Sequence, residues 1–387
     1  MEKTVISANI KRLRMAKHMT QMELAEAAGI SRVALSNIEK GKVAPRVGTL
    51  EALSESLSIQ LKDLVSPVRE LHAVRFRALK RMRTRDQILT EVSRWLTDFS
   101  ELEDILNDRE PYELDKITAR LKKLSPGVER AKMAANMVRD HFKLDPDEPI
   151  WDICGLLEKH GIKILPLSRA SDSFFGLSIA GENGGPAIVV NTWDRISVER
   201  WIFSAAHELG HLLFHLDAFD ANKKQEDREE EKEADLFASY FLMPSRAFSK
   251  EWKETFGKPF IDRVVKVKRI FRVSYKTVLY RLVQEKIVSP DIWKKFNNAY
   301  KQRFGKALLR ASEPKALAAK AFMAHAPESQ ASREPVSLSP TDFMENRLGR
   351  LVRRAIEAGE ITMSRCAEIL GLSLSEMREL TASWLAV

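Results

Sequence analysis

The sequence contains little cysteine: Cys154 and Cys366 are its two cysteines, and they lie far apart in a chain of 387 residues. Neither has a second cysteine at the CxxC spacing, so no disulfide framework is implied. The chain also lacks an apolar run long enough to cross a membrane, and its polar first residues do not form a secretion signal. These absences argue against a secreted disulfide-rich protein and predict a cytoplasmic, reducing setting.

The composition is basic. A net charge of +9 and an isoelectric point near 9.4 suit a polyanionic partner, although Lys and Arg are spread widely and could equally be solvated surface. The densest basic run lies in residues 69–85. We expect it to form a helix, either one that touches DNA phosphates or a partner's acidic surface or, as we favour, the exposed side of a linker helix.

An HExxH motif occurs at residues 207–211, His-Glu-Leu-Gly-His, inside a run that has a helical pattern. Residues four apart lie on one face of a helix, so His207 and His211 can bind one zinc ion, with Glu208 near a water in the open position of the ion. Two surface histidines on an amphipathic helix are the alternative. Apolar flanks on both sides favour a buried helix, in which the imidazole nitrogens need a partner such as a metal.

A catalytic zinc ion takes three protein ligands. A third histidine ten residues after the first is excluded, because Asp217 stands there. The acidic helix predicted in residues 226–244 can supply a carboxylate instead. Glu231 lies near the edge of the apolar stripe of that helix and is the first choice for third ligand, and Glu230, on the opposite edge, is the second.

Three more polar residues belong to these two helices. Asp235, one turn after Glu231, is expected to accept a hydrogen bond from a histidine ligand and so orient it. Glu233 is expected to point towards solvent. His215, one turn after His211, is expected to lie behind the ligands or in the core, because three turns of one helix cannot converge on a tetrahedral ion.

If the metal is present, it lowers the pKa of a bound water to near 7 and polarises the scissile carbonyl. Glu208 would take the proton of that water and pass it to the leaving amine. A further group must stabilise the developing oxyanion. Tyr240, Tyr275 and Tyr280 are candidates, and the sequence does not choose between them.

The N-terminal residues have clear helix signals. Residues 20–23, Thr-Gln-Met-Glu, form a capping box, and Gly29 ends the helix that follows. Ser31 caps a second helix that ends at Gly41. Two short helices joined by a glycine-containing turn predict a helix-turn-helix. In the second helix Leu35 and Ile38 face inward, while Arg32, Val33, Asn37 and Lys40 face outward.

Across about sixty residues this segment resembles the XRE (Cro/repressor-like) DNA-binding family. The resemblance implies that Gln21 contacts a phosphate and that Arg32, Val33 and Asn37 contact base edges, with Val33 suited to a thymine methyl group. It also implies a homodimer on paired half-sites of an operator. A plain helical bundle or a protein-binding domain is the alternative.

A second resemblance is carried by an ordered set of motifs: Phe-Gly-Leu-Ser at 175–178, Pro-Ala-Ile-Val-Val-Asn at 186–191, Glu199-Arg200, the HExxH core, and the run that ends at Pro244. This set resembles the ImmA/IrrE metallopeptidase family. The resemblance implies a gluzincin-like Zn²⁺ site of two histidines and a glutamate with a catalytic glutamate, and cleavage of a few protein partners, typically repressors. Ser204 stands where that family often has threonine, which leaves the ligands untouched.

We therefore expect a mainly α, multidomain chain. Its predicted parts are an all-α helix-turn-helix bundle (1–66), a helical spacer (67–126), an α+β metallopeptidase domain (127–300), a linker (301–340) and a C-terminal helical module (341–387). In the spacer, helices are expected at 87–99 and 112–124. In the metallopeptidase domain, helices are expected at 128–141 and 149–160 and strands at 162–167, 174–179 and 187–191.

Three functions fit this organisation. The first is a DNA-bound regulator that is also a zinc endopeptidase and cleaves a specific protein such as a repressor. The second is an antitoxin that binds its own operator and neutralises a toxin through the metallopeptidase-like domain. The third is a transcription factor that senses zinc or stress without catalysis. The intact Glu208 favours the first over the third.

Overall fold

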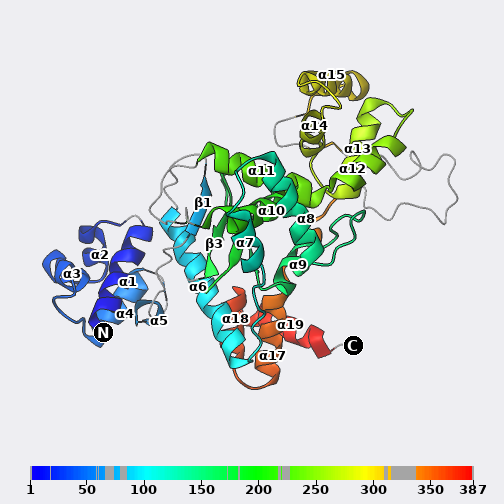
Figure 1. Ribbon diagram of the computed structural model, residues 1–387. Helices are drawn as coiled ribbons and strands as arrows, with labels where there is room; N and C mark the ends of the chain where they lie inside the picture. The colour runs from blue at the N-terminus through cyan, green and yellow to red at the C-terminus, as the bar shows by residue number, and fades with distance from the viewer. Residues whose placement is uncertain are drawn as a thin grey trace. The chain divides into compact units, whose positions relative to one another are not determined.

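The computed structural model describes residues 2–17, 19–57, 59, 61–65, 74–78, 85–171, 173–181, 184–216, 219, 227–308, 313–314 and 337–385. The chain divides into two compact units (Figure 1). The first comprises residues 1–71 and 81–98, and the second comprises residues 72–80 and 99–387. The predicted spacer, 67–126, is thus shared between the two units.

The first unit is a helical bundle. Its helices are α1 (Glu2–Ala16), α2 (Gln21–Ala27), α3 (Arg32–Glu39), α4 (Val47–Ser56), α5 (Leu61–Val65) and the first part of α6 (Arg85–Ile105). The Thr20 hydroxyl accepts a hydrogen bond from the Glu23 amide at 3.2 Å, and the Glu23 carboxylate accepts one from the Thr20 amide at 2.6 Å. Gly29 has a φ of +65°, which favours glycine and lets the chain turn into α3. These contacts confirm the predicted helix-turn-helix.

The basic run at 69–85 does not form the predicted helix. Its described central part is strand β1 (Val74–Ala78), and its last residue, Arg85, opens α6; the remaining residues lie outside the described ranges. Val-Arg-Phe-Arg-Ala alternates apolar and charged residues, which is the period of a strand. The density of positive charge had suggested a solvated helix, but this alternation and an available sheet edge decide the conformation.

The second unit contains a four-stranded sheet. Strands β2 (Lys163–Leu167), β3 (Phe174–Ile179) and β4 (Ala187–Asn191) lie at the predicted places. The order is β1-β3-β4-β2, with β2 and β4 parallel and the other neighbours antiparallel. All of β4 is buried, as expected for a strand covered on both faces.

Helices pack around this sheet. The second unit contains α7 (Asp115–Leu121), α8 (Val128–His141), α9 (Ile153–Lys159), α10 (Val198–Phe214) and α11 (Arg228–Leu242). Helix α10 packs against β3, β4 and α11. A Cβ on Gly210 would lie 3.1 Å from Phe237 Cδ1 and 3.2 Å from Ala234 Cα, so the glycine in the middle of the HExxH motif permits the close approach of α11. This approach brings the acidic start of α11 to the two histidines.

The C-terminal part is also helical. It contains α12 (Ser245–Glu254), α13 (Phe260–Phe271), α14 (Tyr275–Gln284), α15 (Ile292–Phe304), the 3₁₀ helix η4 (Pro340–Asp342), α17 (Arg347–Glu357), α18 (Met363–Leu370) and α19 (Leu374–Leu385). Arg347 is buried and forms an ion pair with Glu103 at 2.6 Å, and Phe343 lies in the main core. The predicted C-terminal module thus packs as part of the second unit.

Most of the predicted linker, 301–340, lies outside the described residues, although α15 occupies its start. The predicted fold class, mainly α with a small sheet, is confirmed. Among the described residues, none of the helices combines the length and the apolar character that a membrane crossing requires.

Candidate metal centre

Three side chains from two helices converge. His207 and His211 come from α10, and Glu231 comes from the first turn of α11. The Nε2 atoms of the two histidines lie 2.9 Å apart, and the Glu231 carboxylate lies 3.2 Å from each of them through a different oxygen. Both histidines are fully buried. A tetrahedral zinc ion with Zn–N bonds of about 2.0–2.1 Å separates its ligand atoms by roughly 3.3 Å, so the spacing fits one small cation.

The far nitrogen of His207 has a carboxylate partner. Its Nδ1 lies 2.7 Å from Asp235 Oδ1, one turn after Glu231 on α11. A carboxylate only accepts hydrogen bonds, so the imidazole carries its proton on Nδ1 and directs the lone pair of Nε2 towards His211 and Glu231. Asp235 thus lies where the sequence predicted an orienting acceptor.

The far nitrogen of His211 meets a second histidine. Its Nδ1 lies 2.9 Å from His215 Nδ1, and His215 Nε2 lies 3.3 Å from Glu233 Oε2. Burial raises the pKa of Glu233, but hydrogen bonds from His215 and Arg130 outweigh burial and bring it to about 2. Glu233 is therefore an acceptor. When His215 donates from Nε2 to Glu233 and accepts at Nδ1, the proton of His211 lies on Nδ1 and its Nε2 lone pair faces Glu231.

The two hydrogen-bond paths leave three acceptor atoms facing one another. Burial, before any other cause, holds the pKa of His211 well below its usual value, which keeps the imidazole neutral. Two imidazole lone pairs and a carboxylate at this spacing repel one another without a cation between them, so the donor set fits a divalent metal ion.

Glu208 lies on α10, fully buried, against strand β3. A Cβ on Gly176 would lie 3.0 Å from Glu208 Oε1 and 2.9 Å from the carbonyl oxygen of Val189. The glycine in the Phe-Gly-Leu-Ser motif therefore makes room for the Glu208 carboxylate. The motif that carried the resemblance has a steric explanation.

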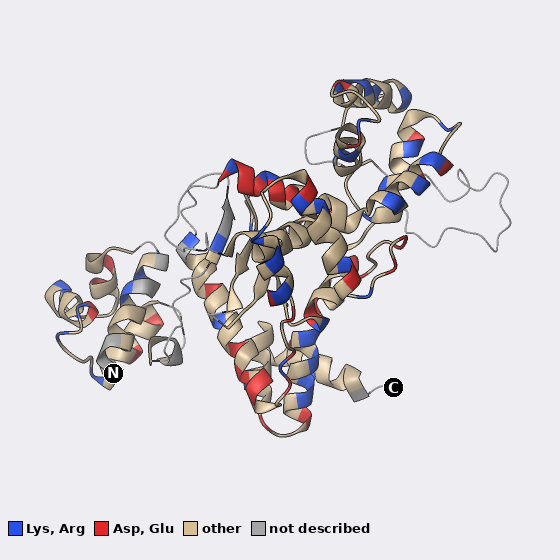
Figure 2. Cartoon of the chain, viewed as in Figure 1, with Lys and Arg blue, Asp and Glu red and all other residues tan. Residues whose placement is uncertain are grey.

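The structure separates the two candidates for third ligand. Glu231 faces the histidines, whereas Glu230 makes an ion pair with Arg75 of β1 at 2.5 Å. Arg75 also contacts Glu231 at 3.1 Å. Sequence reasoning missed the contact of this arginine with Glu231, because its position depends on a strand that we expected to be helix. Figure 2 shows the acidic residues gathered on the first half of α11.

The expectation that Glu233 points to solvent was wrong. Glu233 is 3% exposed and is held by Arg130 Nε at 2.8 Å and by the Gly127 amide at 2.9 Å. The helical stripe of α11 identifies the face that meets α10, but α8 covers an adjacent face. Because α11 packs on both α10 and α8, it buries polar residues that its apolar stripe alone predicts to be exposed.

The three tyrosines occupy different places. Tyr275 is buried and stacks on Phe296, and Tyr240 is buried against the guanidinium of Arg281. Tyr280 is 37% exposed, and its pKa is raised by burial and by the nearby charge of Asp235, which is the partner of His207. Tyr280 is therefore the most exposed of the three and the one whose pKa responds to the charge of Asp235.

On helix α3, Arg32 is exposed, Val33 is 70% exposed and Asn37 is half-buried, and Lys40, which caps the C-terminus of this helix, is exposed. Gln21 donates a hydrogen bond to Glu39 at 2.7 Å, and Arg14 holds the same carboxylate at 2.6 Å. The predicted base-reading side chains thus lie along one helix, next to a glutamine fixed by internal hydrogen bonds.

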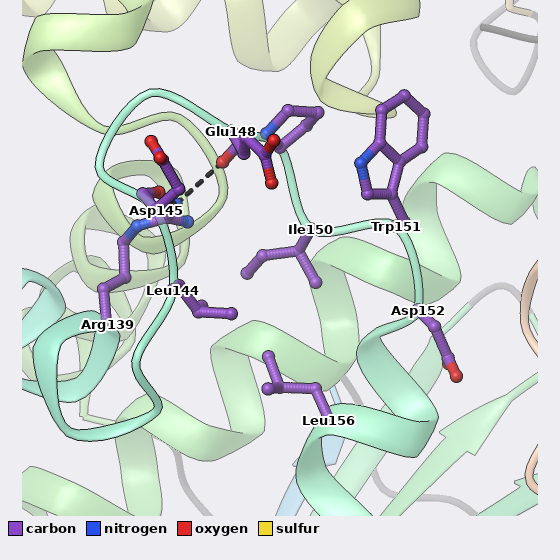
Figure 3. A pocket seen from close by; sticks show the side chains of 9 residues that line it. Arg139, Leu144, Asp145, Glu148, Ile150, Trp151, Asp152 and Leu156 are labelled. Atoms are coloured by element: carbon purple, nitrogen blue, oxygen red, sulfur yellow. Dashed lines mark hydrogen bonds between the residues drawn. The ribbon is translucent and has the colours of Figure 1, made fainter. Parts of the chain in front are cut away.

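Two other features lie apart from this centre. A pocket of about 190 Å³ beside the loop after α8 is lined by Ile150, Trp151 and Leu156, and Arg139 ties its loop through the carbonyl of Glu148 (Figure 3). A second group of three donors consists of Glu113, His141 and His160. The Glu113 side chain is 53% exposed and lies 3.3 Å from His141, so a surface contact accounts for this group and we assign no metal to it.

Comparison with known proteins gives two family matches. A helix-turn-helix model matches residues 10–64, and a model of the IrrE N-terminal-like domain, a peptidase family, matches residues 157–283. The uncharacterized HTH-type transcriptional regulator y4dJ of Sinorhizobium fredii is 36% identical over 66 residues, which are 17% of this chain and 86% of that protein. This chain belongs to the helix-turn-helix regulators.

This regulator joins its DNA-binding domain to an IrrE-like peptidase domain. It is also similar to the immunity repressor protein of Bacillus phage phi105, with 38% identity over 60 residues, which are 16% of this chain and 42% of the repressor. The ImmF control region 10 kDa protein of the same phage is 39% identical over 59 residues, which are 15% of this chain and 66% of that protein. The chain thus spans less than half the length of the phage repressor that it matches.

Proposed function

We propose that this regulator binds operator DNA through α3 and uses Zn²⁺, held by His207, His211 and Glu231, to hydrolyse a peptide bond in a specific protein partner such as a repressor. The observation that carries the proposal is the convergence of two imidazole nitrogens and a carboxylate beside a buried glutamate. Zinc bound there would polarise the scissile carbonyl and acidify a water.

The chain's own residues prepare this chemistry. Asp235 and the His215–Glu233 pair fix the protons of the two histidines on Nδ1, so neither imidazole can rotate to offer the wrong nitrogen. Glu208 accepts a proton from the attacking water at its carboxylate and returns it to the leaving amine. Gly176 keeps β3 close to that carboxylate. Tyr280, the most exposed of the three candidate tyrosines, is the side chain that we assign to the oxyanion.

At the other domain, Arg32, Val33 and Asn37 would read base edges in the major groove, with Lys40 beside them. Gln21, held by Glu39, would donate to a phosphate. Binding as a homodimer would place two copies of α3 on paired half-sites. DNA as partner makes the cytoplasm the compartment of this regulator.

The test compares the wild-type protein with Glu208→Gln in a host strain from which the gene has been removed. We expect new protein N-termini in the proteome with the wild type and none with Glu208→Gln, while both bind one zinc ion. Glu229→Gln is the matched control, because Glu229 lies on α11 with a side chain that is 82% exposed.

The same experiment separates the alternatives. A wild-type protein that yields no more new N-termini than Glu208→Gln, or a Glu208→Gln variant that still neutralises a toxin, would refute the hydrolytic role. If Glu208→Gln still neutralises a toxin, the protein is better explained as an antitoxin. If zinc changes operator binding and no protein is cleaved, it is better explained as a zinc-sensing transcription factor. A wild-type protein without zinc would remove the basis of the proposal.

A further inference from the structure

Strand β3 is the strand of the sheet that lies against Glu208. Gly176 of β3 lies against Glu208, and β3 packs on α10, which carries both histidines. One edge of β3 pairs with β4. An extended chain that pairs with the opposite edge would therefore run past Glu208 and the histidines. Pairing of a peptide with a sheet edge is a common mode of recognition, in which backbone hydrogen bonds supply affinity and pockets supply specificity.

That edge already has an occupant. Strand β1 pairs antiparallel with β3, from Val74 opposite Ile179 to Arg77 opposite Gly176, and the register shifts between Arg77 and Ala78. In the sequence β1 follows the helix-turn-helix bundle and precedes α6. The strand beside the metal centre thus comes from the segment that connects the DNA-binding helices to the peptidase domain.

Arg75 joins strand β1 to the candidate metal ligand Glu231. Its side chain is 8% exposed, and its two terminal nitrogens lie 2.5 Å from Glu230 and 3.1 Å from Glu231. The Glu231 oxygen that Arg75 contacts is Oε1, which also lies 3.2 Å from His211 Nε2. The guanidinium and a metal ion would therefore share one carboxylate. A fixed positive charge at that place opposes the binding of a second cation.

We propose that β1 is a built-in occupant of the substrate edge of β3, and that the substrate is an extended segment with a basic side chain at the position of Arg75, taken by Glu230 and Glu231. This inference rests on the proposed peptidase function, and it adds the class of substrate and the way in which the activity is regulated. The site opens when β1 leaves β3. Release of Arg75 frees the Glu231 carboxylate in the same step.

The first test measures binding without hydrolysis. A fluorescent peptide with the sequence of residues 72–80, HAVRFRALK, is titrated against two proteins, both with Glu208→Gln: one with its own β1, and one in which residues 72–80 are a Gly-Ser linker of equal length. We expect anisotropy to report binding at least 10-fold tighter to the linker variant. A peptide with glutamate in place of the arginine at position 75 should bind at least 10-fold more weakly. Equal affinity for the two proteins, or no binding to either, would overturn the proposal.

The second test asks whether the affinity for zinc rises or falls when Arg75 is removed. It does not depend on the folding of the linker variant. Arg75→Ala should increase the affinity for zinc by roughly 10-fold in a chelator competition, because a positive charge leaves the carboxylate. If Arg75 only orients Glu231 as a support for the metal, the affinity falls instead, and the inhibitory role is wrong. Arg303→Ala, which removes an ion pair with Asp262 on α13, is the matched control and should leave zinc affinity unchanged.

These outcomes are distinguishable from failure of the proposed function. If the protein binds the peptide and zinc as described but cleaves nothing, the edge of β3 is a peptide-binding site and the proposed peptidase function is wrong. If the protein cleaves partners but the peptide binds equally well with and without β1, the peptidase function stands and the proposal that β1 occupies the substrate edge is wrong.

Discussion

The Nδ1 atoms of His211 and His215 lie 2.9 Å apart. Through this contact a candidate metal ligand is joined to Glu233, a buried carboxylate with two further partners in Arg130 and Gly127. The other ligand, His207, reaches its carboxylate Asp235 directly. The two histidines of one motif are thus oriented by different means, one through a second histidine.

His215→Phe should weaken zinc binding by roughly 10- to 100-fold, the usual cost of losing a partner behind a metal ligand. Phenylalanine fills the ring volume but offers no acceptor to His211 Nδ1. The measurement is the zinc dissociation constant from competition with a chelating dye. His141→Phe, at a half-buried histidine on α8, should leave that constant unchanged. An unaltered affinity in His215→Phe would show that the contact does not orient His211.

Gly176→Ala should lower turnover by about 100-fold, because displacement of a catalytic group by about 1 Å has an effect of that size. The new Cβ would lie 2.9 Å from a backbone oxygen that cannot move freely, so the Glu208 side chain must shift. Peptide cleavage and zinc content are measured together, and zinc content should stay near one per chain. Gly181→Ala is the control, since a Cβ there meets nothing within 4 Å.

Arg32→Ala should weaken binding to DNA selected by the wild-type protein by about 1–3 kcal/mol and relax the preference at one base position. Gel-shift titration over a range of salt concentrations would measure this. Lys116→Ala, an exposed lysine on α7 in the second unit, removes the same charge and should have little effect. Equal losses in both variants would indicate that overall charge, rather than α3, supplies the affinity.

Stability should depend on pH through Glu158. Burial, aided by the charge of Glu345, raises the pKa of this carboxyl from 4.5 to about 7. In the folded state it stays protonated up to that pH, so its stabilising contribution is present below pH 4.5 and is lost as the pH rises through 7. The full difference is about 3 kcal/mol.

Glu158→Gln removes this dependence and keeps an acceptor for the amides of Asn346 and Arg347. We expect the variant to melt above the wild type at pH 8.5 and at the same temperature at pH 4.5. Glu110→Gln, at an exposed position, is the control. The difference in melting temperature between the wild type and Glu158→Gln should grow between pH 5 and pH 8.5. A constant difference would contradict the raised pKa.

Local chemistry made several features predictable. The capping box at Thr20, the glycine turn at Gly29 and strands β2, β3 and β4 were predicted correctly, because each depends on neighbours within a few residues. The spacing of His207 and His211 fixed their shared face for the same reason. The acidic run before Ala234 indicated a carboxylate for the histidines but could not alone decide between Glu230 and Glu231.

The sequence by itself therefore determined the helix-turn-helix, the paired histidines and the neighbouring carboxylates, since helix geometry relates residues three and four apart. Only the tertiary structure decided the rest. Glu233 became buried because α8 covers a second face of α11, and Arg75 reached Glu231 because β1 pairs with β3. Both contacts join residues more than one hundred positions apart, and no local period encodes which distant surfaces will meet.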